Sequence, residues 1–122
     1  MLSLEGDGSA MYTIQSLWTQ AREALPVTTI IFANNSYAIL KAEYANMGAG
    51  TPGPQALAMI DIDRPTIDWV AMAKSMGVPG VQVSTAEDFY HAMARSAQEP
   101  GPALIEVKLY EEAAWPAPRP RV

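Results

Sequence analysis

The stretch VTTIIFANNSY, residues 27–37, decides the fold of this chain. Its first seven residues are apolar almost throughout, which is typical of a parallel strand covered on both faces. The polar residues Asn34, Asn35 and Ser36 follow directly, and residues 37–47 beyond them have the pattern of a helix. The stretch therefore predicts a buried strand whose carboxyl end passes through a polar loop into a helix.

The same order of strand, polar loop and helix precedes this stretch. Residues 1–4 predict a short strand, and GDGS at residues 6–9 is the polar loop. Residues 10–25 predict a helix that Pro26 ends, because apolar residues recur there at helical spacing. The inward face of this helix is expected to carry Ile14, Leu17, Trp18 and Ala21.

Beyond residue 47 the alternation continues. Helices are predicted over 66–76 and from a cap at Ser84 or Thr85 to about residue 97, and strands over 78–83 and 103–109. Between them, GAGTPGP at 48–54 is too rich in Gly and Pro for regular structure. Two interpretations of this loop stay open, a lid over a site and a surface connection.

Alternating strands and helices with short connections predict a three-layer α/β fold. We expect a mainly parallel sheet with helices on both faces and right-handed crossovers. One domain is predicted over residues 1–112, followed by a Pro-rich tail over 113–122. In such sheets ligands bind beyond the carboxyl ends of the strands, so the two polar loops are candidates for one shared site.

The composition excludes several classes of function. The 122 residues carry 13 acidic and 8 basic side chains, for a net charge of −5. An acidic chain without a basic stripe is not expected to bind nucleic acid or an anionic membrane. No apolar run approaches the roughly 18 residues of a membrane helix, and no signal peptide is recognisable, so we expect a cytoplasmic protein. The absence of cysteine excludes disulfides, zinc–thiolate sites and cysteine nucleophiles.

The two polar loops contain the residue types of a metal–diphosphate site. Asp7 offers an anionic oxygen and Asn34 an amide oxygen, and Mg²⁺ is commonly held by one or two carboxylates together with substrate phosphates. Gly8 and Ser9 open a predicted helix, whose free N–H groups and dipole favour a phosphate. Gly6 and Gly8 would let the backbone approach closely. The residues alone leave an alternative open, in which GDG is an ordinary turn and the two asparagines form an ordinary cap.

The spacing of these residues resembles the signature of the thiamine-diphosphate-dependent enzymes, in which a GDG is followed at a fixed interval by an asparagine. Here the interval from Asp7 to Asn34 is 27 positions. The similarity extends over essentially the whole chain, and the segments NNSYAIL and DWVAMAKSMGVPG look most like acetolactate synthase large subunits. The resemblance implies the pyrophosphate-binding half of the thiamine-diphosphate-binding fold, truncated at its N-terminus.

The resemblance also implies a set of metal ligands. Asp7 and Asn34 would bind Mg²⁺ through side-chain oxygens, and Ser36 would contribute its backbone carbonyl. Asn35 is a rival for Asn34, because the two stand side by side. Spacing favours Asn34, since SYAIL then falls in register with the family.

Contacts with thiamine diphosphate follow from the same resemblance. Gly8 and Ser9 would meet the diphosphate, while Ile39 and Leu40 would line the substrate side of the thiazolium ring. Pyruvate decarboxylases have a glutamate at the position of Leu40, so its absence argues against that subfamily. The expected cofactor-binding residues are Gly6, Asp7, Gly8, Ser9, Asn34, Ser36, Tyr37, Ala38, Ile39 and Leu40.

The function implied is that of an acetolactate-synthase-like carboligase, which decarboxylates a 2-keto acid and transfers the product to an acceptor. In this family the activating glutamate lies on a pyrimidine-binding domain of the same or another subunit. We therefore expect no catalytic residue in this chain, no turnover by the chain alone, and assembly into a homo-oligomer. Two alternatives are a truncated, non-catalytic oligomeric α/β module and the domain of another thiamine-diphosphate enzyme, such as a benzoylformate-type decarboxylase.

Other polar residues receive plainer interpretations. Asp61, Asp63 and Asp68 form an acidic cluster without the spacing of a calcium loop, and Asp63 or Thr66 is interpreted as a helix cap. The corresponding loop of relatives lies near the cofactor, so Asp61 has a second interpretation. His91, the single histidine, is interpreted as a solvated helix residue.

Overall fold

Four parallel strands form one sheet in the order β1-β2-β4-β3 in the computed structural model of the chain, which describes residues 1–48 and 50–109. The predicted strand VTTIIFA becomes β2, and every residue of β2 except Phe32 is buried. The mainly parallel sheet is confirmed, whereas the predicted tail at 113–122 lies outside the described residues. The strands are β1 (Leu2–Gly6), β2 (Thr28–Ala33), β3 (Gly80–Val83) and β4 (Ala103–Lys108).

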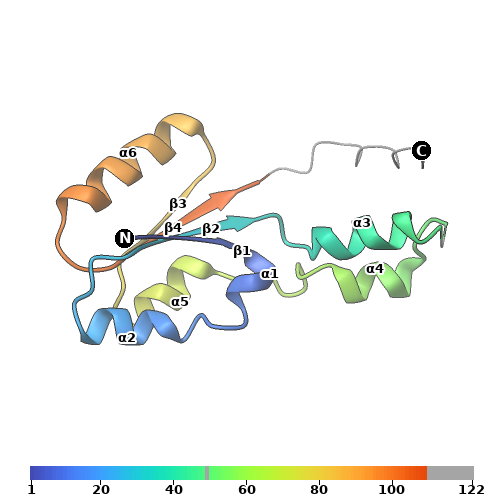
Figure 1. The fold of residues 1–122 in the computed structure, drawn as a ribbon, viewed down its shortest axis with the longest axis horizontal. Helices are drawn as coiled ribbons and strands as arrows, with labels where there is room; N and C mark the ends of the chain where they lie inside the picture. Colours follow the sequence, from blue (N-terminus) through green and yellow to red (C-terminus); the bar gives the residue numbers. More distant parts are fainter. Residues whose placement is uncertain (49, 110–122) are drawn as a thin grey trace.

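Helices cover both faces of the sheet, as predicted (Figure 1). The chain steps in one direction from β1 to β2 and on to β3, and then reverses to reach β4. A constant crossover hand places the helix of the reversed step on the opposite face. No helix in the described part of the chain is long and apolar enough to cross a membrane. The helices α1 (Asp7–Ala10), α2 (Ser16–Arg22) and α5 (Trp69–Ser75) lie on one face, and α6 (Ala86–Gln98) lies on the other.

Two apolar clusters join these layers. The larger one lies between β2, β4 and the three helices of the first face, and the smaller one lies beneath α6. Burial of these side chains is the main stabilising contribution, at about 25 cal/mol per Å² of apolar surface. The larger cluster contains Ala10, Leu17, Ile31, Ala33, Trp69, Ala73, Val78 and Leu104, and the smaller contains Ile30, Val83, Ala92 and Ile105.

Side-chain caps fix the starts of α5 and α6. The Asp68 carboxylate accepts the Ala71 N–H at 2.8 Å, and the Thr85 hydroxyl accepts the Asp88 N–H at 3.1 Å. The second cap is one of the two predicted. The first corrects the prediction of Asp63 or Thr66, because α5 begins at Trp69 and Asp68 is the residue next to its first turn.

The predicted helix over 10–25 is wrong as one element. A four-residue turn, α1, is followed by turns at 11–15 and then by the seven-residue α2. Leu17 is buried, but Trp18 is 53% exposed and lies under the Arg22 guanidinium, 4.9 Å from its ring centroid. Helical spacing identifies a set of apolar residues but does not show which of them pack against the sheet.

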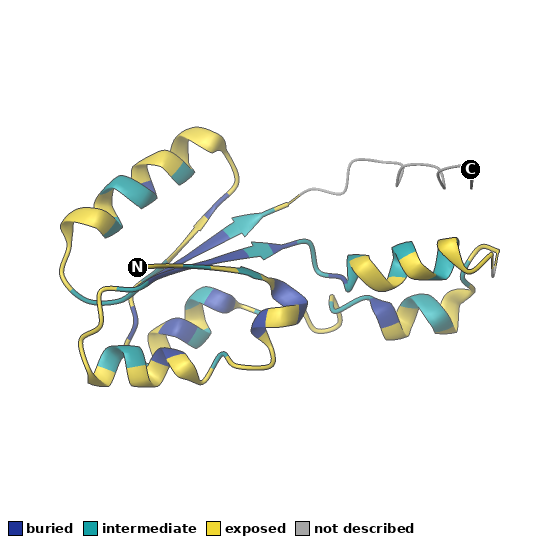
Figure 2. Ribbon diagram, viewed as in Figure 1, coloured by how far each residue is buried: buried dark blue, intermediate teal, exposed yellow. Residues whose placement is uncertain are grey.

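Two helices form a hairpin that extends beyond the carboxyl ends of the strands (Figure 1). They are α3 (Ala38–Asn46) and α4 (Pro54–Ile60). The prediction missed α4 because the adjacent Gly- and Pro-rich loop obscured its start, yet proline at the first helical position is favourable. Only Ile60 of the described hairpin helices is buried, as Figure 2 shows by the scarcity of dark blue there.

One sheet edge carries uncovered apolar side chains. Leu2 and Leu4 of β1 are 57% and 64% exposed. Their register partners are Thr28 and Ile30, so they lie on the face that α6 covers, but α6 contacts β3 and β4. The β1 end of this face therefore presents apolar surface.

Candidate functional site

The two predicted loops meet at the carboxyl ends of β1 and β2. The sheet register pairs Gly6 with Phe32, so Asp7 and Asn34 follow neighbouring strands at the same edge. The contact is direct, because the backbone N–H of Asn35 donates to Oδ2 of Asp7 over 2.6 Å. The structure thus brings together the GDG loop (residues 6–8) and the ANN loop (residues 33–35), whose Asp7 and Asn34 lie 27 positions apart in the sequence.

Asp7 is a buried carboxylate with no cationic partner among the described residues. The residue is 3% exposed, and its two carboxylate oxygens accept hydrogen bonds from the backbone N–H groups of Gly8 at 2.8 Å and of Asn35. No ion pair joins it to a Lys, Arg or His within residues 1–48 and 50–109. Because an unpaired buried charge is costly, this carboxylate is suited to a bound cation.

Asn34 faces the same space as Asp7. Its Oδ1 accepts the Ser36 N–H at 3.0 Å, a local bond that asparagine commonly makes in turns, and the amide oxygen retains a second lone pair. Asn35 takes a positive φ of 56°, a region that asparagine tolerates better than most residues. Asn34 lines a cavity together with Asp7, whereas Asn35 lines a neighbouring one. The geometry favours Asn34, and the choice of ligand stays a prediction.

A cavity of about 230 Å³ lies over these loops. It joins the polar groups to the apolar side chains of Phe32, Ile39 and Leu109, of which Phe32 and Leu109 were not predicted. Leu40 does not line it, because consecutive residues of α3 point about 100° apart around the helix axis. The lining residues are Gly6, Asp7, Gly8, Ser9, Phe32, Asn34, Ser36, Tyr37, Ala38, Ile39 and Leu109.

The close approach at Gly8 serves a neighbouring side chain. A Cβ at Gly8 would lie 2.6 Å from ring carbons of Tyr37, whereas a Cβ at Gly6 would meet no atom within 4 Å. The Gly8 N–H already donates to Asp7, and α1 has only four residues. The expected start of a long helix is therefore a single turn with a small dipole. A phosphate here would depend on local N–H groups and on a metal more than on a helix dipole.

Asp61 contacts the ANN loop from the hairpin side. It lies opposite Ser36 in an isolated antiparallel bridge, and its Oδ1 accepts the Ser36 hydroxyl at 3.1 Å. The Lys41 ammonium lies 2.8 Å from the same oxygen. This ammonium holds the pKa of the Asp61 carboxyl below its ordinary value, against the opposing effect of burial and with help from the Ser36 hydroxyl. Asp61 therefore lies beside the candidate site, and its position near a cofactor, the second sequence interpretation, stays a prediction.

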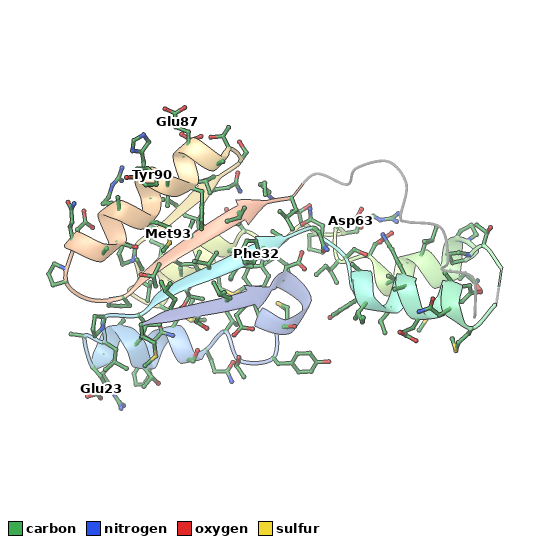
Figure 3. All side chains as sticks on the ribbon, turned by 45° about the horizontal axis from the view of Figure 1, so that its top comes forward. Glu23, Phe32, Asp63, Glu87, Tyr90 and Met93 are labelled. Atoms are coloured by element: carbon green, nitrogen blue, oxygen red, sulfur yellow. The ribbon has the colours of Figure 1, made fainter. Side chains whose placement is uncertain are left out.

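A second cavity, of about 310 Å³, adjoins the first on this side. It shares Asn34, Ser36 and Leu109 with the first cavity. The remaining lining residues are polar, so the ANN loop is the wall between an apolar-rich cavity and a polar one. Asp63, labelled in Figure 3 beyond the strand ends, belongs to the polar cavity.

Acidic and histidine residues elsewhere do not form a second metal centre. No group of three or more His, Cys, Asp or Glu residues that could hold a metal occurs within the described ranges. The His91 side chain is 64% exposed on α6 and lies 3.9 Å from Glu87, which Figure 3 labels in the first turn of that helix. The interpretation of His91 as a solvated helix residue is therefore confirmed. A metal at Asp7 would need amide, carbonyl and phosphate oxygens to complete its coordination.

Comparison with protein families supplies the identification. The family described as "Thiamine pyrophosphate enzyme, C-terminal TPP binding domain" matches residues 1–107. The chain belongs to this family. Thiamine pyrophosphate is another name for thiamine diphosphate, so the resemblance read from the GDG and ANN loops is confirmed.

Relatives of this C-terminal thiamine pyrophosphate-binding domain include synthases and decarboxylases. The protein named "Putative acetolactate synthase large subunit IlvX" of Mycobacterium tuberculosis is 55% identical over 108 residues, which are 88% of this chain and 21% of that protein. Benzoylformate decarboxylase of Pseudomonas aeruginosa is 31% identical over 107 residues, which are 88% of this chain and 19% of that protein.

A solved structure confirms the fold of the domain. The thiamine diphosphate-dependent 4-hydroxybenzoylformate decarboxylase of Rhodococcus jostii RHA1 superposes with a TM-score of 0.81 at 35% identity. The match covers 93% of this chain and 20% of the decarboxylase chain. The thiamine pyrophosphate-binding domain described here thus spans about a fifth of the length of the proteins it matches.

Proposed function

We propose that this chain is the thiamine-diphosphate- and Mg²⁺-binding domain of an acetolactate-synthase-like enzyme that decarboxylates a 2-keto acid and transfers the product to an acceptor. The observation that carries the proposal is the buried Asp7 carboxylate, which lacks a cationic partner among the described residues and shares a cavity with Asn34. The 55% identity to the M. tuberculosis protein favours the synthase group.

The donor set fits a magnesium diphosphate. Mg²⁺ takes oxygen ligands and is usually held by one or two carboxylates together with phosphate oxygens. Asp7 would contribute a carboxylate oxygen, Asn34 an amide oxygen and Ser36 a backbone carbonyl oxygen. Gly8 and Ser9 would lie against the diphosphate. One protein carboxylate and one divalent ion leave a net positive charge, which is what an anionic diphosphate requires.

The apolar lining would serve the reacting end of the cofactor. When bound, thiamine diphosphate would supply the electron sink for decarboxylation of a 2-keto acid. Ile39, Phe32 and Leu109 offer apolar surface in the cavity that Asp7 enters from its polar side. Such side chains would exclude water from the reacting end of the cofactor and would lower the polarity around it. These residues would bind and orient the cofactor, and none of them would carry a proton.

Partners must complete the enzyme. One side of the apolar lining lies on α3, which buries none of its residues, so another surface is needed to enclose a substrate. We propose that a pyrimidine-binding domain, of the same or another subunit, provides that surface and the activating glutamate. The chain alone would then bind cofactor weakly and turn over no 2-keto acid, and the assembled enzyme would be a cytoplasmic homo-oligomer.

Titration calorimetry of the chain with thiamine diphosphate, with and without MgCl₂, tests the metal site. We expect weak binding that requires Mg²⁺ and is abolished in Asp7→Asn, which keeps a hydrogen-bond acceptor but removes the charge. Glu43→Gln, which removes a charge from an exposed position of α3, is the matched control and should bind as the wild type does. Absence of Mg²⁺-dependent binding, even with a pyrimidine-binding domain added, would falsify the proposal.

A benzoylformate-type decarboxylase is the second candidate, favoured by the 35% identity and TM-score of 0.81 to the R. jostii enzyme. Product analysis of the longer protein, supplied with pyruvate or with benzoylformate, separates the two. An acetolactate-type product from pyruvate supports the first candidate. Simple release of an aldehyde from benzoylformate supports the second.

A non-catalytic oligomeric module is the third candidate, and the exposed Leu2 and Leu4 on β1 favour it. It predicts self-association that does not respond to ligands. Light scattering that finds a stable oligomer, unchanged by thiamine diphosphate and Mg²⁺, would support it against the two enzymatic candidates.

A further inference from the structure

We infer that Asp61, held by Lys41, positions the magnesium-binding loop by anchoring Ser36 from the side opposite to the cofactor cavity. The inference rests on the proposed function in one respect, namely that the loop binds Mg²⁺. Its structural content, that the Asp61 side chain fixes the conformation of residues 34–37, stands without the metal.

Backbone bonds on both sides of Ser36 join the loop to the end of α4. The Tyr37 N–H donates to the Ile60 carbonyl at 2.9 Å, and the Ile62 N–H donates to the Asn35 carbonyl at 2.9 Å. In this type of antiparallel pair the central residues exchange no backbone bonds with each other. The N–H and carbonyl of Ser36 therefore face away from Asp61.

The N–H and carbonyl of Ser36, which face away from Asp61, are the groups that would support the proposed metal site. Its N–H donates to Oδ1 of Asn34 at 3.0 Å. Because the N–H and carbonyl of an extended residue point to the same side, the Ser36 carbonyl is directed to the side of Asn34. Rotation of the 35–37 backbone would break the bond between the Ser36 N–H and Asn34 Oδ1 and would turn the Ser36 carbonyl away from the side of Asn34.

The side-chain bond to Asp61 opposes that rotation. Ser36 is 5% exposed, so its hydroxyl has little access to water, and Asp61 Oδ1 is its acceptor at 3.1 Å. Hydrogen bonds to ionised groups are shorter and about twice as strong as neutral ones. The backbone pairing sets the register of the two segments, and this bond sets the orientation of Ser36.

The Lys41 ammonium compensates the negative charge of Asp61, which would otherwise lie close to the proposed diphosphate. Its Nζ lies 2.8 Å from the same Oδ1 that Ser36 uses. Without this ammonium, Asp61 would add an uncompensated negative charge in the cavity that adjoins that of Asp7 and would repel an anionic cofactor. The ion pair also fixes the Asp61 carboxylate, because Lys41 is carried by the first turns of α3, directly after the loop. Asp61 and Lys41 thus act on the metal through Ser36.

Amide hydrogen exchange of the chain without cofactor tests the anchor. Asp61→Ala and Ser36→Ala should each speed exchange at Ser36, Tyr37 and Ile62 by roughly tenfold or more, while amides of β2 and β4 keep wild-type rates. Asp61→Asn retains an oxygen that can accept the Ser36 hydroxyl, so it should restore part of the protection. Asp63→Asn, two residues away in the same polar cavity, is the control and should leave the loop unchanged.

A metal titration tests the consequence for the site. At a fixed concentration of thiamine diphosphate, the apparent affinity for Mg²⁺ should fall about 10- to 100-fold in Asp61→Ala and Ser36→Ala, the range found for residues that support metal ligands. Saturating Mg²⁺ should restore cofactor binding, because the ligands themselves remain. The double variant should bind Mg²⁺ no more weakly than the weaker-binding single variant, since both substitutions remove the same Ser36–Asp61 hydrogen bond.

The outcomes separate this inference from the proposed function. Loop exchange that is unchanged in Asp61→Ala, or that rises equally in β2 and β4, overturns the inference, because Asp61 would then be dispensable or would serve overall stability. Faster local exchange supports it, even if the wild type binds no Mg²⁺, a result that would count against the proposed function alone. Faster exchange with wild-type Mg²⁺ affinity overturns the link between the anchor and the metal.

Discussion

The two halves of the candidate site differ in what holds them in place. The polar half is built on the sheet, where Asp7 is 3% exposed and both of its carboxylate oxygens accept backbone N–H groups. The apolar half is shared between Phe32 and Leu109 at the strand ends and Ile39 of α3, a helix in which no residue is buried and Ile39 is 68% exposed. The polar half is therefore preformed, whereas the α3 side of the apolar half is left open to a second surface.

The difference has a physical cause in packing. The ends of β1 and β2 are continuous with the apolar core, so moving Asp7 would disturb the sheet. The sheet and the helices packed on it, α1, α2, α5 and α6, form the body of the domain. The hairpin of α3 and α4 is joined to this body at its base, through the pairing of Ser36 with Asp61. Segments with few buried apolar contacts open at lower free-energy cost than core strands.

The largest expected effect on the free energy of unfolding comes from a substitution in the body of the domain. Ile31 is fully buried in β2, and Ile31→Ala should lower the free energy of unfolding by about 2–5 kcal/mol, through lost apolar burial and the cavity left behind. Urea denaturation followed by circular dichroism measures this. Ile39→Ala removes the same atoms from the hairpin and should change stability by less than about 0.5 kcal/mol. Equal losses of stability in Ile31→Ala and Ile39→Ala would contradict the difference in packing between the sheet and the hairpin.

A smaller effect is expected where the two halves touch. Gly8→Ala would place a methyl group 2.6 Å from the Tyr37 ring, and either Tyr37 or α1 must move. The overpacking should lower stability by about 1–3 kcal/mol, measured by thermal denaturation. The matched substitution Gly6→Ala meets no atom within 4 Å and should leave the fold unchanged. If Gly8→Ala is neutral, Tyr37 is not held against the GDG loop and the two halves move independently.

Much of the polar half could be predicted from the sequence, for one topological reason. Parallel strands end at the same edge of a sheet, so two polar loops that each follow an apolar strand are brought together without any knowledge of contacts. VTTIIFA gave the central strand because apolar residues on both faces are required there. The hydrogen bond that the Asn35 N–H donates to the Asp7 carboxylate shows that the two loops meet as this argument predicts.

The missed features depend on contacts that leave little local trace. Trp18 has the spacing of a core residue, but α2 is set by the break at 11–15, and the sheet accepts Leu17 instead. Asp61 meets Ser36 across 25 positions, and acidic residues before a helix resemble caps equally well. Leu109 follows the last strand at the shared edge, so the topological argument applied to Asp7 and Asn34 could have found it.

Caps of body helices should have a moderate effect. Asp68→Ala removes the acceptor of the Ala71 N–H at the start of α5, the helix that carries Trp69 into the core. The expected loss of stability is about 1 kcal/mol, visible as a lower midpoint of thermal unfolding. Asp68→Asn keeps an acceptor and should recover most of it. A loss near zero in Asp68→Ala would show that burial of Trp69 fixes α5 without help from its cap.

The smallest effect is expected at the far side of the hairpin. Met59 is 81% exposed on α4, and Met59→Ala exchanges one good helix former for another, so the free energy of unfolding should change by less than about 0.5 kcal/mol. Its neighbour Ile60 is 7% exposed, and its carbonyl accepts the Tyr37 N–H, so it marks the point where the hairpin joins the body. Ile60→Ala should therefore cost more than Met59→Ala in the same denaturation experiment, although the two residues are adjacent. A large loss at Met59 would mean that the outer surface of the hairpin packs within the isolated chain, and the apolar half of the site would then not depend on a partner for its cover.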